Sequence, residues 1–195
     1  MNTIVVALRV TLFTLVLTGI LYPLASTGLA QVLFPRQANG SMLTDDKGQL
    51  VGSELIAQGF VKAAYFQPRP SAAGEKGYDA TASGGSNLST TSKKLRDRVR
   101  AELARLHEEN PDAKDPVPSE LLTTSASGLA PHISPEAARW QLARVAKARG
   151  VPVDRLRRLL DSQTERRGLG FLGEPRVNVL LLNLALDRQL GRPGA

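Results

Sequence analysis

The hydrophobic pattern of the chain is most pronounced near its start. From Val10 to Phe34, 25 consecutive residues carry no charged side chain, and the residues before them carry only Arg9. A bilayer core requires about 20 apolar helical residues to cross it, and such a helix satisfies its own backbone hydrogen bonds. The pattern predicts a short N-terminal segment over residues 1–9, a transmembrane helix over residues 10–34 and a soluble domain over residues 35–195.

Two other interpretations of the apolar run stay open. Arg9, Gly28 and Ala30 are compatible with the charged start and the small-residue cleavage site of a signal peptide, although the run exceeds the usual apolar region of about 7–15 residues. The core helix of a soluble protein would also be apolar. Within the run, Pro23 lacks a backbone donor, which predicts a kink. The small and hydroxyl side chains would either face a neighbouring membrane helix or bond their own backbone; they are Thr11, Thr14, Thr18, Gly19 and Ser26.

Beyond the apolar run, helical spacing alternates with loops. Apolar residues recur every three or four positions after Ser92, which predicts a helix that ends before Pro111. Ser134, Pro135 and Gly150 are typical start and stop residues of the next helix. The remaining predicted elements are a short strand, or a strand running into a turn, over 50–56, a long loop over 65–91, and helices over 153–166 and 175–190. The fold class is therefore α+β, with one helix-rich soluble domain and a small sheet expected within residues 40–80.

Composition narrows the kinds of partner. The chain has no cysteine, which excludes disulfides and thiolate metal sites. Its net charge is +7, and residues 139–192 hold twelve Lys or Arg against five Asp or Glu. Few aromatic residues lie among these charges, and no known nucleic-acid-binding motif is present. We therefore expect no nucleic-acid partner, but a solvated basic face or one turned to anionic lipid or to an acidic protein.

The sequence carries no familiar catalytic motif. It has neither a phosphate-binding P-loop nor an H-E-x-x-H zinc motif. His107 lies among charged residues of a predicted helix, where solvation is the simplest interpretation. His132 would cap or pack, with a role as metal ligand as the alternative. The Gly- and Ser-rich segment from Ser83 to Asn87 has backbone donors that could hold an anion, and a structural turn is the alternative.

Taken together, the loop motifs resemble one family. The segments Tyr65-Phe66-Gln67-Pro68-Arg69-Pro70-Ser71, Ser83-Gly84-Gly85-Ser86-Asn87, Pro131-His132-Ile133-Ser134-Pro135 and Gly173-Glu174-Pro175-Arg176-Val177-Asn178 occur in the order typical of the C subunit of the bacterial Kdp potassium-transporting ATPase. The family-motif residues carried over are Arg69, Ser71, Ser83, Gly84, Gly85, Ser86, Asn87, Ser127, Gly128, His132, Glu174, Arg176 and Asn178, with Val10, Gly19, Tyr22, Pro23 and Phe34 in the transmembrane segment. The chain departs from the family pattern at Ala130, where an acidic residue is usual, and at Leu88–Ser92.

The resemblance implies a non-catalytic, single-span accessory subunit of an ATP-driven, high-affinity potassium uptake pump in the bacterial inner membrane. Its partners would be the potassium-binding A subunit, the ATP-hydrolysing B subunit, the small F subunit and membrane lipid. The subunit would stabilise the assembly. No covalently bound cofactor is implied, although ATP could be shared with the B subunit in the manner of a catalytic chaperone. An independent single-span protein that binds anions is the alternative.

The resemblance also implies one nucleotide-binding residue and one orientation. Gln141, on the helix after the Pro-His-Ile-Ser-Pro motif, is the family's candidate for contacting ATP, and an exposed helical glutamine is the alternative. The family architecture implies a cytoplasmic N-terminus and a large domain on the outer face. The charges flanking the span, Arg9 on one side and Arg36 and Lys47 on the other, do not fix the orientation by themselves.

Overall fold

The computed structural model describes residues 2–45 and 47–193. The chain divides into two compact units, residues 1–42 and 43–195. The first unit contains the long apolar helix, and the second contains the remaining helices and two small sheets. This arrangement confirms the predicted α+β class with one candidate transmembrane helix.

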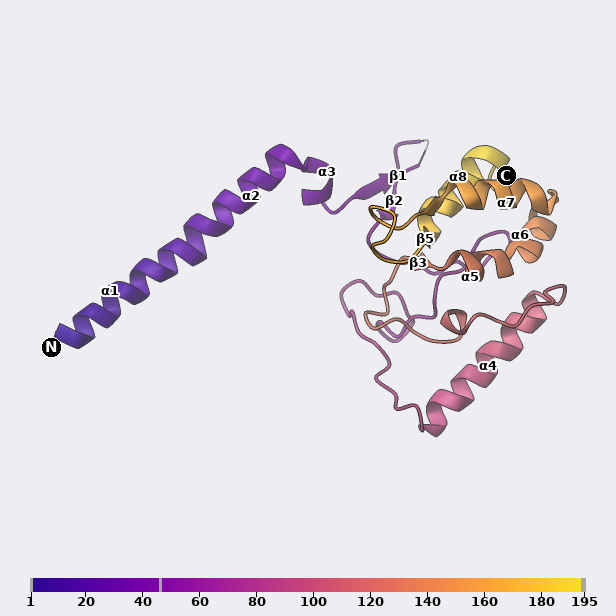
Figure 1. Cartoon of the computed structure of the whole chain (residues 1–195), viewed down its shortest axis with the longest axis horizontal. Helices are drawn as coiled ribbons and strands as arrows, with labels where there is room; N and C mark the ends of the chain where they lie inside the picture. Colours follow the sequence, from indigo (N-terminus) through magenta and orange to yellow (C-terminus); the bar gives the residue numbers. More distant parts are fainter. Residues whose placement is uncertain (1, 46, 194–195) are drawn as a thin grey trace. The chain divides into compact units, whose positions relative to one another are not determined.

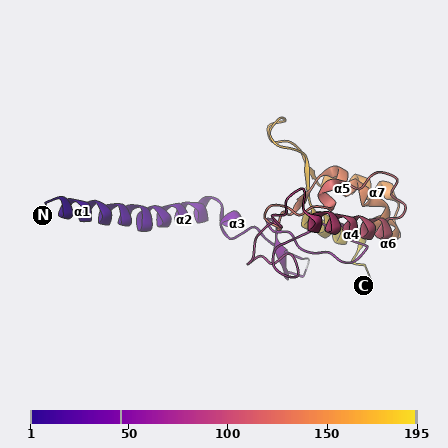
Figure 2. The same cartoon turned by 90° about the horizontal axis from the view of Figure 1, so that it is seen from below.

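Residues 2–33 of the N-terminal unit form a continuous helix (Figure 2), made of α1 (Asn2–Val16), a π-helical turn (Leu17–Leu21) and α2 (Tyr22–Leu33). Phe34, whose backbone is not helical, separates this helix from the short α3 (Pro35–Ala38). Residues Asn2–Leu33 are long and apolar enough to cross a membrane, and none of their side chains is buried. The interpretation as the buried core helix of a soluble protein is therefore wrong.

The π-helical turn contains Gly19 and ends just before Pro23. Proline removes one helical hydrogen bond and crowds the carbonyl four residues earlier, and a local π turn is one way to accommodate such a disturbance. The hydroxyls of Thr14 and Thr18 donate to the carbonyls of Val10 and Thr14, at 2.9 and 2.7 Å. These two side chains therefore bond their own backbone. The transmembrane-segment residues Tyr22 and Phe34 are exposed in this unit.

The second unit begins with a two-stranded sheet and a long irregular segment. Strands β1 (Met42–Thr44) and β2 (Leu50–Ser53) form this sheet, as predicted for residues 40–80. No regular helix or strand follows until α4 (Lys93–Glu109), so the predicted loop over 65–91 and the predicted helix after Ser92 are both confirmed.

The C-terminal half contains a second, unexpected sheet. A 3-10 turn (Ser119–Leu121) and β3 (His132–Ile133) precede α5 (Pro135–Trp140), α6 (Leu142–Arg149) and α7 (Val153–Ser162). Strands β4 (Thr164–Glu165) and β5 (Arg176–Asn178) then lead into α8 (Val179–Leu190). The strand order is β3-β5-β4, and both pairings are antiparallel, with Val177 opposite Ile133 on one side and Thr164 on the other.

This sheet corrects the predicted helix over 175–190. Residues Arg176–Asn178 form a central strand, and the helix begins only at Val179. There are two reasons. The side chain of Asn178 caps the helix by accepting from the N–H of Leu181. Val177, just before it, is buried and paired with a strand on each side. The predicted helix over 153–166 similarly ends at Ser162, where β4 begins shortly afterwards.

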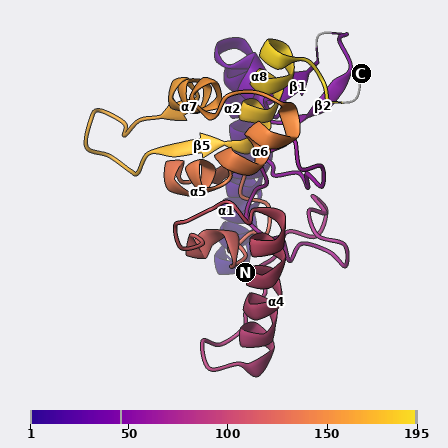
Figure 3. The same cartoon turned by 90° about the vertical axis from the view of Figure 1, so that its right-hand side faces the viewer.

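The hydrophobic core lies among α5 to α8 and their sheet. Helix α7 packs against α5, α6 and α8, and Figures 1 and 3 show this group on one side of the domain, with α4 on the other. Phe66, from the long irregular segment, is fully buried in the core, and Leu106 joins it from α4. The long segment is therefore part of the domain interior and links the two helical parts.

Candidate functional site

The centre of the domain is an irregular segment, residues 63–67, that leaves a turn and is held by helix side chains. Arg144 donates to the carbonyls of Ala63 and Tyr65 at 2.7 and 3.1 Å, and Arg149 donates to the carbonyl of Ala64 at 2.7 Å. Asn183 bonds both the N–H and the carbonyl of Phe66, each at 2.9 Å. Buried backbone groups must find partners, and here α6 and α8 supply them where no neighbouring strand does.

Gln141 also holds this segment through hydrogen bonds. It lies at the break between α5 and α6, and only 1% of its surface is exposed. Its amide oxygen accepts from the backbone N–H of Gln67 and from Arg144, both at 2.8 Å, while its amide nitrogen donates to the carbonyls of Gln67 and Ala137. The interpretation of Gln141 as an exposed helical residue is therefore wrong, because its side chain is buried and hydrogen-bonded inside the domain.

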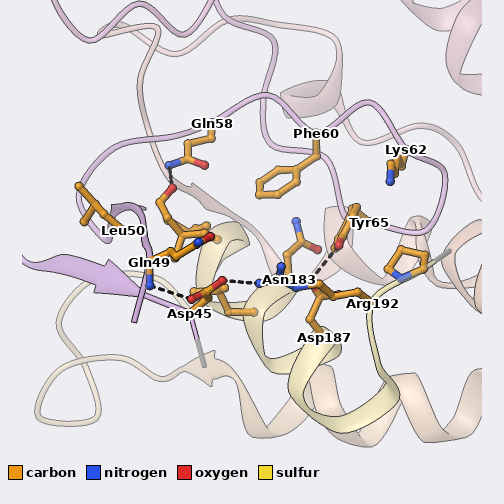
Figure 4. A pocket seen from close by; sticks show the side chains of 14 residues that line it. Asp45, Gln49, Leu50, Gln58, Phe60, Lys62, Tyr65, Asn183, Asp187 and Arg192 are labelled. Carbon is orange, nitrogen blue, oxygen red and sulfur yellow. Dashed lines mark hydrogen bonds and ion pairs between the residues drawn. The ribbon is translucent and has the colours of Figure 1, made fainter. Parts of the chain in front are cut away.

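A cavity of about 510 Å³ lies beside the 63–67 segment, between the two-stranded sheet and α8. Figure 4 shows Tyr65, Asp187 and Arg192 gathered at one end of it. Asp187 accepts from the Tyr65 hydroxyl and from Arg149, each at 2.8 Å, and Arg192 pairs with Asp45 at 2.7 Å. The hydrogen bond from Arg192 holds the pKa of Asp45 below its usual value, while burial raises the pKa of Tyr65.

The cavity also has an apolar wall. Phe60, Leu180 and Leu184 line it together with the polar side chains of Gln58 and Lys62. Such a lining suits a small polar ligand or the chain's own packing. Sequence analysis missed this cavity, because its residues lie far apart along the chain and belong to no common motif.

The family-motif loops come together in a second cluster. The Arg69 guanidinium donates to the backbone of Thr124 at 3.1 Å, and the Ser71 hydroxyl donates to the carbonyl of Gly128 at 2.6 Å. The backbone N–H of Gly84 donates to the carbonyl of Ser127 at 2.8 Å. These contacts join the loop over 69–87 to the loop over 123–129.

The Gly- and Ser-rich segment of this cluster forms hydrogen bonds with the loop over 123–129. The Ser83 hydroxyl donates to the same Ser127 carbonyl as the Gly84 N–H, and the Thr124 hydroxyl donates to the hydroxyl of Ser86. At Gly85 an added Cβ would lie 2.8 Å from the carbonyl oxygen of Ala126. Asn87 has a positive φ of 47°, which asparagine tolerates. These contacts support the structural-turn interpretation of residues 83–87.

The remaining motif residues lie on or next to the three-stranded sheet. His132 pairs with Asn178 across β3 and β5, and its Nε2 is 3.9 Å from a Glu165 oxygen. Burial, followed by the charge of Arg176, lowers the pKa of His132, so the neutral ring is favoured. Asn178 donates to the carbonyl of Glu54 at 2.8 Å. Over residues 2–45 and 47–193, no group of three His, Cys, Asp or Glu side chains could hold a metal ion.

Arg176 and Glu174 each form an ion pair across the β4–β5 hairpin, the first between the two strands and the second between the strands and the tip. Arg176 contacts Glu165 at 2.8 Å, and Glu174 contacts Arg167 at 2.6 Å. Both pairs are exposed, where an ion pair contributes at most about 1 kcal/mol. The structure therefore divides the predicted site residues among four places. Gln141 lies in the core, nine residues lie in the loop cluster or beside it, four lie on or next to the three-stranded sheet, and the five transmembrane-segment residues lie in the N-terminal unit.

Comparison with known proteins identifies the family. A family profile described as KdpC, "K+-transporting ATPase, c chain", matches residues 4–188. A potassium-transporting ATPase KdpC subunit of Myxococcus xanthus is 64% identical over 190 residues, covering 97% of this chain and 90% of the relative. KdpC subunits of Rhodospirillum rubrum and Nitratidesulfovibrio vulgaris are 57% and 53% identical, covering 89% and 91% of this chain and 89% and 91% of those relatives. The chain therefore belongs to the KdpC family, the c chains of K+-transporting ATPases.

Proposed function

We propose that this chain is the C subunit of an ATP-driven potassium pump and serves it as a non-catalytic accessory subunit that stabilises the assembly. The relatives are named as KdpC subunits of potassium-transporting ATPases, and they match the chain over nearly its whole length. The proposal includes the potassium-binding A subunit, the ATP-hydrolysing B subunit and the small F subunit as partners.

The observation that carries the accessory role is the engagement of the buried polar side chains. Gln141, Arg144 and Asn183 all bond backbone groups of the 63–67 segment or one another. Side chains held in this way rigidify a domain. A rigid domain on a membrane anchor suits a part that braces larger subunits.

The second proposed role, raising the affinity of the B subunit for ATP, depends on Gln141. For the Gln141 amide to contact a nucleotide, the 63–67 segment would have to separate from α5 and α6 and give up its bonds to Gln67. The ATP role thus requires an opened conformation of the domain core. A domain on the outer face of the membrane, as we propose for this chain, would in addition not meet cytoplasmic ATP.

Co-expression of the pump subunits with and without this chain tests the accessory role. We expect the A and B subunits to lose stable association and potassium-stimulated ATP hydrolysis when the chain is missing. The purified chain alone should hydrolyse no ATP. An intact, fully active pump without this chain, or ATP hydrolysis by the chain alone, would contradict the proposal.

A further inference from the structure

The β4–β5 hairpin carries an apolar tip that the domain leaves uncovered. Leu169, Phe171 and Leu172 are 84%, 70% and 54% exposed, and Figure 2 shows the hairpin projecting from the rest of the domain. Single exposed apolar residues are common on protein surfaces, but three large ones within four positions at a projecting tip form a small continuous patch.

The backbone of the tip is hydrogen-bonded to itself. Gly168 and Leu172 exchange two hydrogen bonds of 2.8 Å, the N–H of Phe171 donates to the carbonyl of Gly168, and the N–H of Gly170 donates to the carbonyl of Arg167. A segment that leaves water for an apolar environment must satisfy its backbone groups internally. The tip meets this requirement for four of the five N–H groups of residues 168–172 and for the carbonyls of Gly168 and Leu172.

The turn places an apolar residue at a position that disfavours it. Leu169 and Gly170 have φ values of +52° and +83°, so both central residues of the turn are left-handed. Asn and Gly are the usual residues of such a turn, and a leucine there raises the backbone energy. The leucine instead extends the apolar surface of the tip, next to Phe171.

Arginines surround the base of the apolar tip. Arg166 is exposed, Arg167 pairs with Glu174 on the facing arm, and Arg176 pairs with Glu165. Guanidinium groups bind phosphate oxygens well and remain charged at any physiological pH. The apolar side chains at the tip would lie among the acyl chains of a bilayer, and the arginines at the base of the tip would lie at the level of its anionic headgroups.

We propose that the hairpin tip, residues 168–172, inserts into the interfacial region of the bilayer that anchors the chain, with Arg166, Arg167 and Arg176 at the headgroup phosphates. A lipid surface is the occupant that the size of the patch favours. Three side chains offer far less than the roughly 800 Å² per partner of a stable protein interface, whereas a bilayer needs no matching surface.

The length of the connecting chain permits this contact. Helix α2 ends at Leu33, and the second unit begins at Leu43. A fully extended chain spans at most about 3.6 Å per residue, so the tether keeps the start of the domain within roughly 35 Å of the end of the span in any orientation. The connection therefore does not by itself prevent the hairpin from reaching the headgroups.

The test uses the full chain, alone, reconstituted into vesicles of phosphatidylcholine with or without phosphatidylglycerol. The cysteine-free sequence allows a single Leu169→Cys substitution carrying an environment-sensitive fluorophore. The matched control is Val61→Cys, at an apolar residue that is 93% exposed on a different loop. We expect blue-shifted emission at position 169, quenching by spin-labelled lipid, and severalfold weaker quenching by aqueous iodide than at position 61.

Two further variants sharpen the result. Phe171→Ser should return the emission at position 169 toward its value in water, and Arg166→Gln should reduce the gain from phosphatidylglycerol. Equal iodide quenching at positions 169 and 61, or equal lipid quenching at both, would overturn the proposal. Protection of position 169 that appears only after the other pump subunits are added would also overturn it, by identifying a protein as the occupant.

Discussion

At the scale of single residues, Gln141 offers the most direct test of what the buried polar side chains do. Replacing it with alanine would leave the backbone N–H and carbonyl of Gln67 without partners and remove one acceptor from Arg144. Each unsatisfied buried group costs about 1–3 kcal/mol. We therefore expect Gln141→Ala to lower the free energy of unfolding by about 2–4 kcal/mol, measured by denaturant titration of the full chain in detergent.

The matched control for this substitution is Gln189→Ala, at an exposed position near the end of α8, where we expect little change. The assembled pump provides the second measurement. A raised Michaelis constant for ATP in the Gln141 variant, with unchanged domain stability, would contradict the structural role and favour the nucleotide role.

Tyr78 is expected to make the stability of the domain fall at alkaline pH. Burial, followed by the charge of Glu102, raises the pKa of its phenol to about 12. The unfolded chain ionises near pH 10, so this group contributes stability that is complete below about pH 10 and is lost as pH rises towards about 12. A shift of about two units corresponds to roughly 2–3 kcal/mol.

Ultraviolet titration of tyrosinate measures this limit directly. Subtracting the titration curve of Tyr78→Phe from that of the wild type should leave the ionisation of one phenol, about two pH units above that of a free tyrosine. Denaturant titrations should show the loss of stability between pH 10 and 12 becoming smaller in Tyr78→Phe. Ionisation of Tyr78 near pH 10 in the folded protein would refute the assignment.

At the scale of elements, Gly128 is the point where the two motif loops approach most closely. Its φ is +68°, and an added Cβ would lie 2.6 Å from the carbonyl oxygen of Gly84 and 2.9 Å from the N–H nitrogen of Ala73. Gly150 has almost the same φ, +64°, with no atom near an added Cβ. The pair therefore separates backbone strain from loop packing.

We expect Gly150→Ala to lower the free energy of unfolding by about 1 kcal/mol, the ordinary cost of a left-handed alanine. Gly128→Ala should cost about 1–3 kcal/mol more, because backbone atoms on both loops must move. Chemical denaturation of the two variants gives the comparison. Equal losses would mean that the loop cluster adapts easily and does not link the two segments tightly.

At the scale of the whole molecule, the anchor and the domain are separable. No residue of the apolar helix is buried, whereas the second unit has its own core. Deleting residues 1–35 should therefore leave a folded domain, as judged by circular dichroism and cooperative unfolding, but abolish stable co-purification with the other pump subunits. A truncated chain that still assembles and supports full transport would reduce the anchor to a targeting device.

The proposed sidedness can be tested with the same cysteine-free background. Cysteines introduced at the exposed positions Thr91 and Ser162 should react with a membrane-impermeant thiol reagent in cells whose outer membrane is permeable and whose inner membrane is intact. A cysteine at Asn2 serves as the cytoplasmic control and should react only after the inner membrane is opened. The reverse pattern would place the domain in the cytoplasm and restore a direct route to ATP.

Local signals in the sequence were enough for several elements. The apolar run produced one long helix, and the periodic residues after Ser92 produced α4. Ser134 caps α5 by accepting from the N–H of Ala137, and Gly150 ends α6 with a positive φ, both as predicted. These features depend on the conformational preferences and hydrogen bonds of residues within a turn or two, which a sequence displays directly.

The site depends on contacts between distant residues, and only the tertiary structure decided it. Tyr65 meets Asp187 across 122 positions, and Asp45 meets Arg192 across 147. No periodicity marks such pairs. Val177 and its neighbours became a strand, although their spacing fits a helix, because β3 and β4 flank them. Gln141 reads as a surface residue by its local sequence, yet its amide is buried and bonds the backbone N–H and carbonyl of Gln67, since a buried N–H or carbonyl must be hydrogen-bonded.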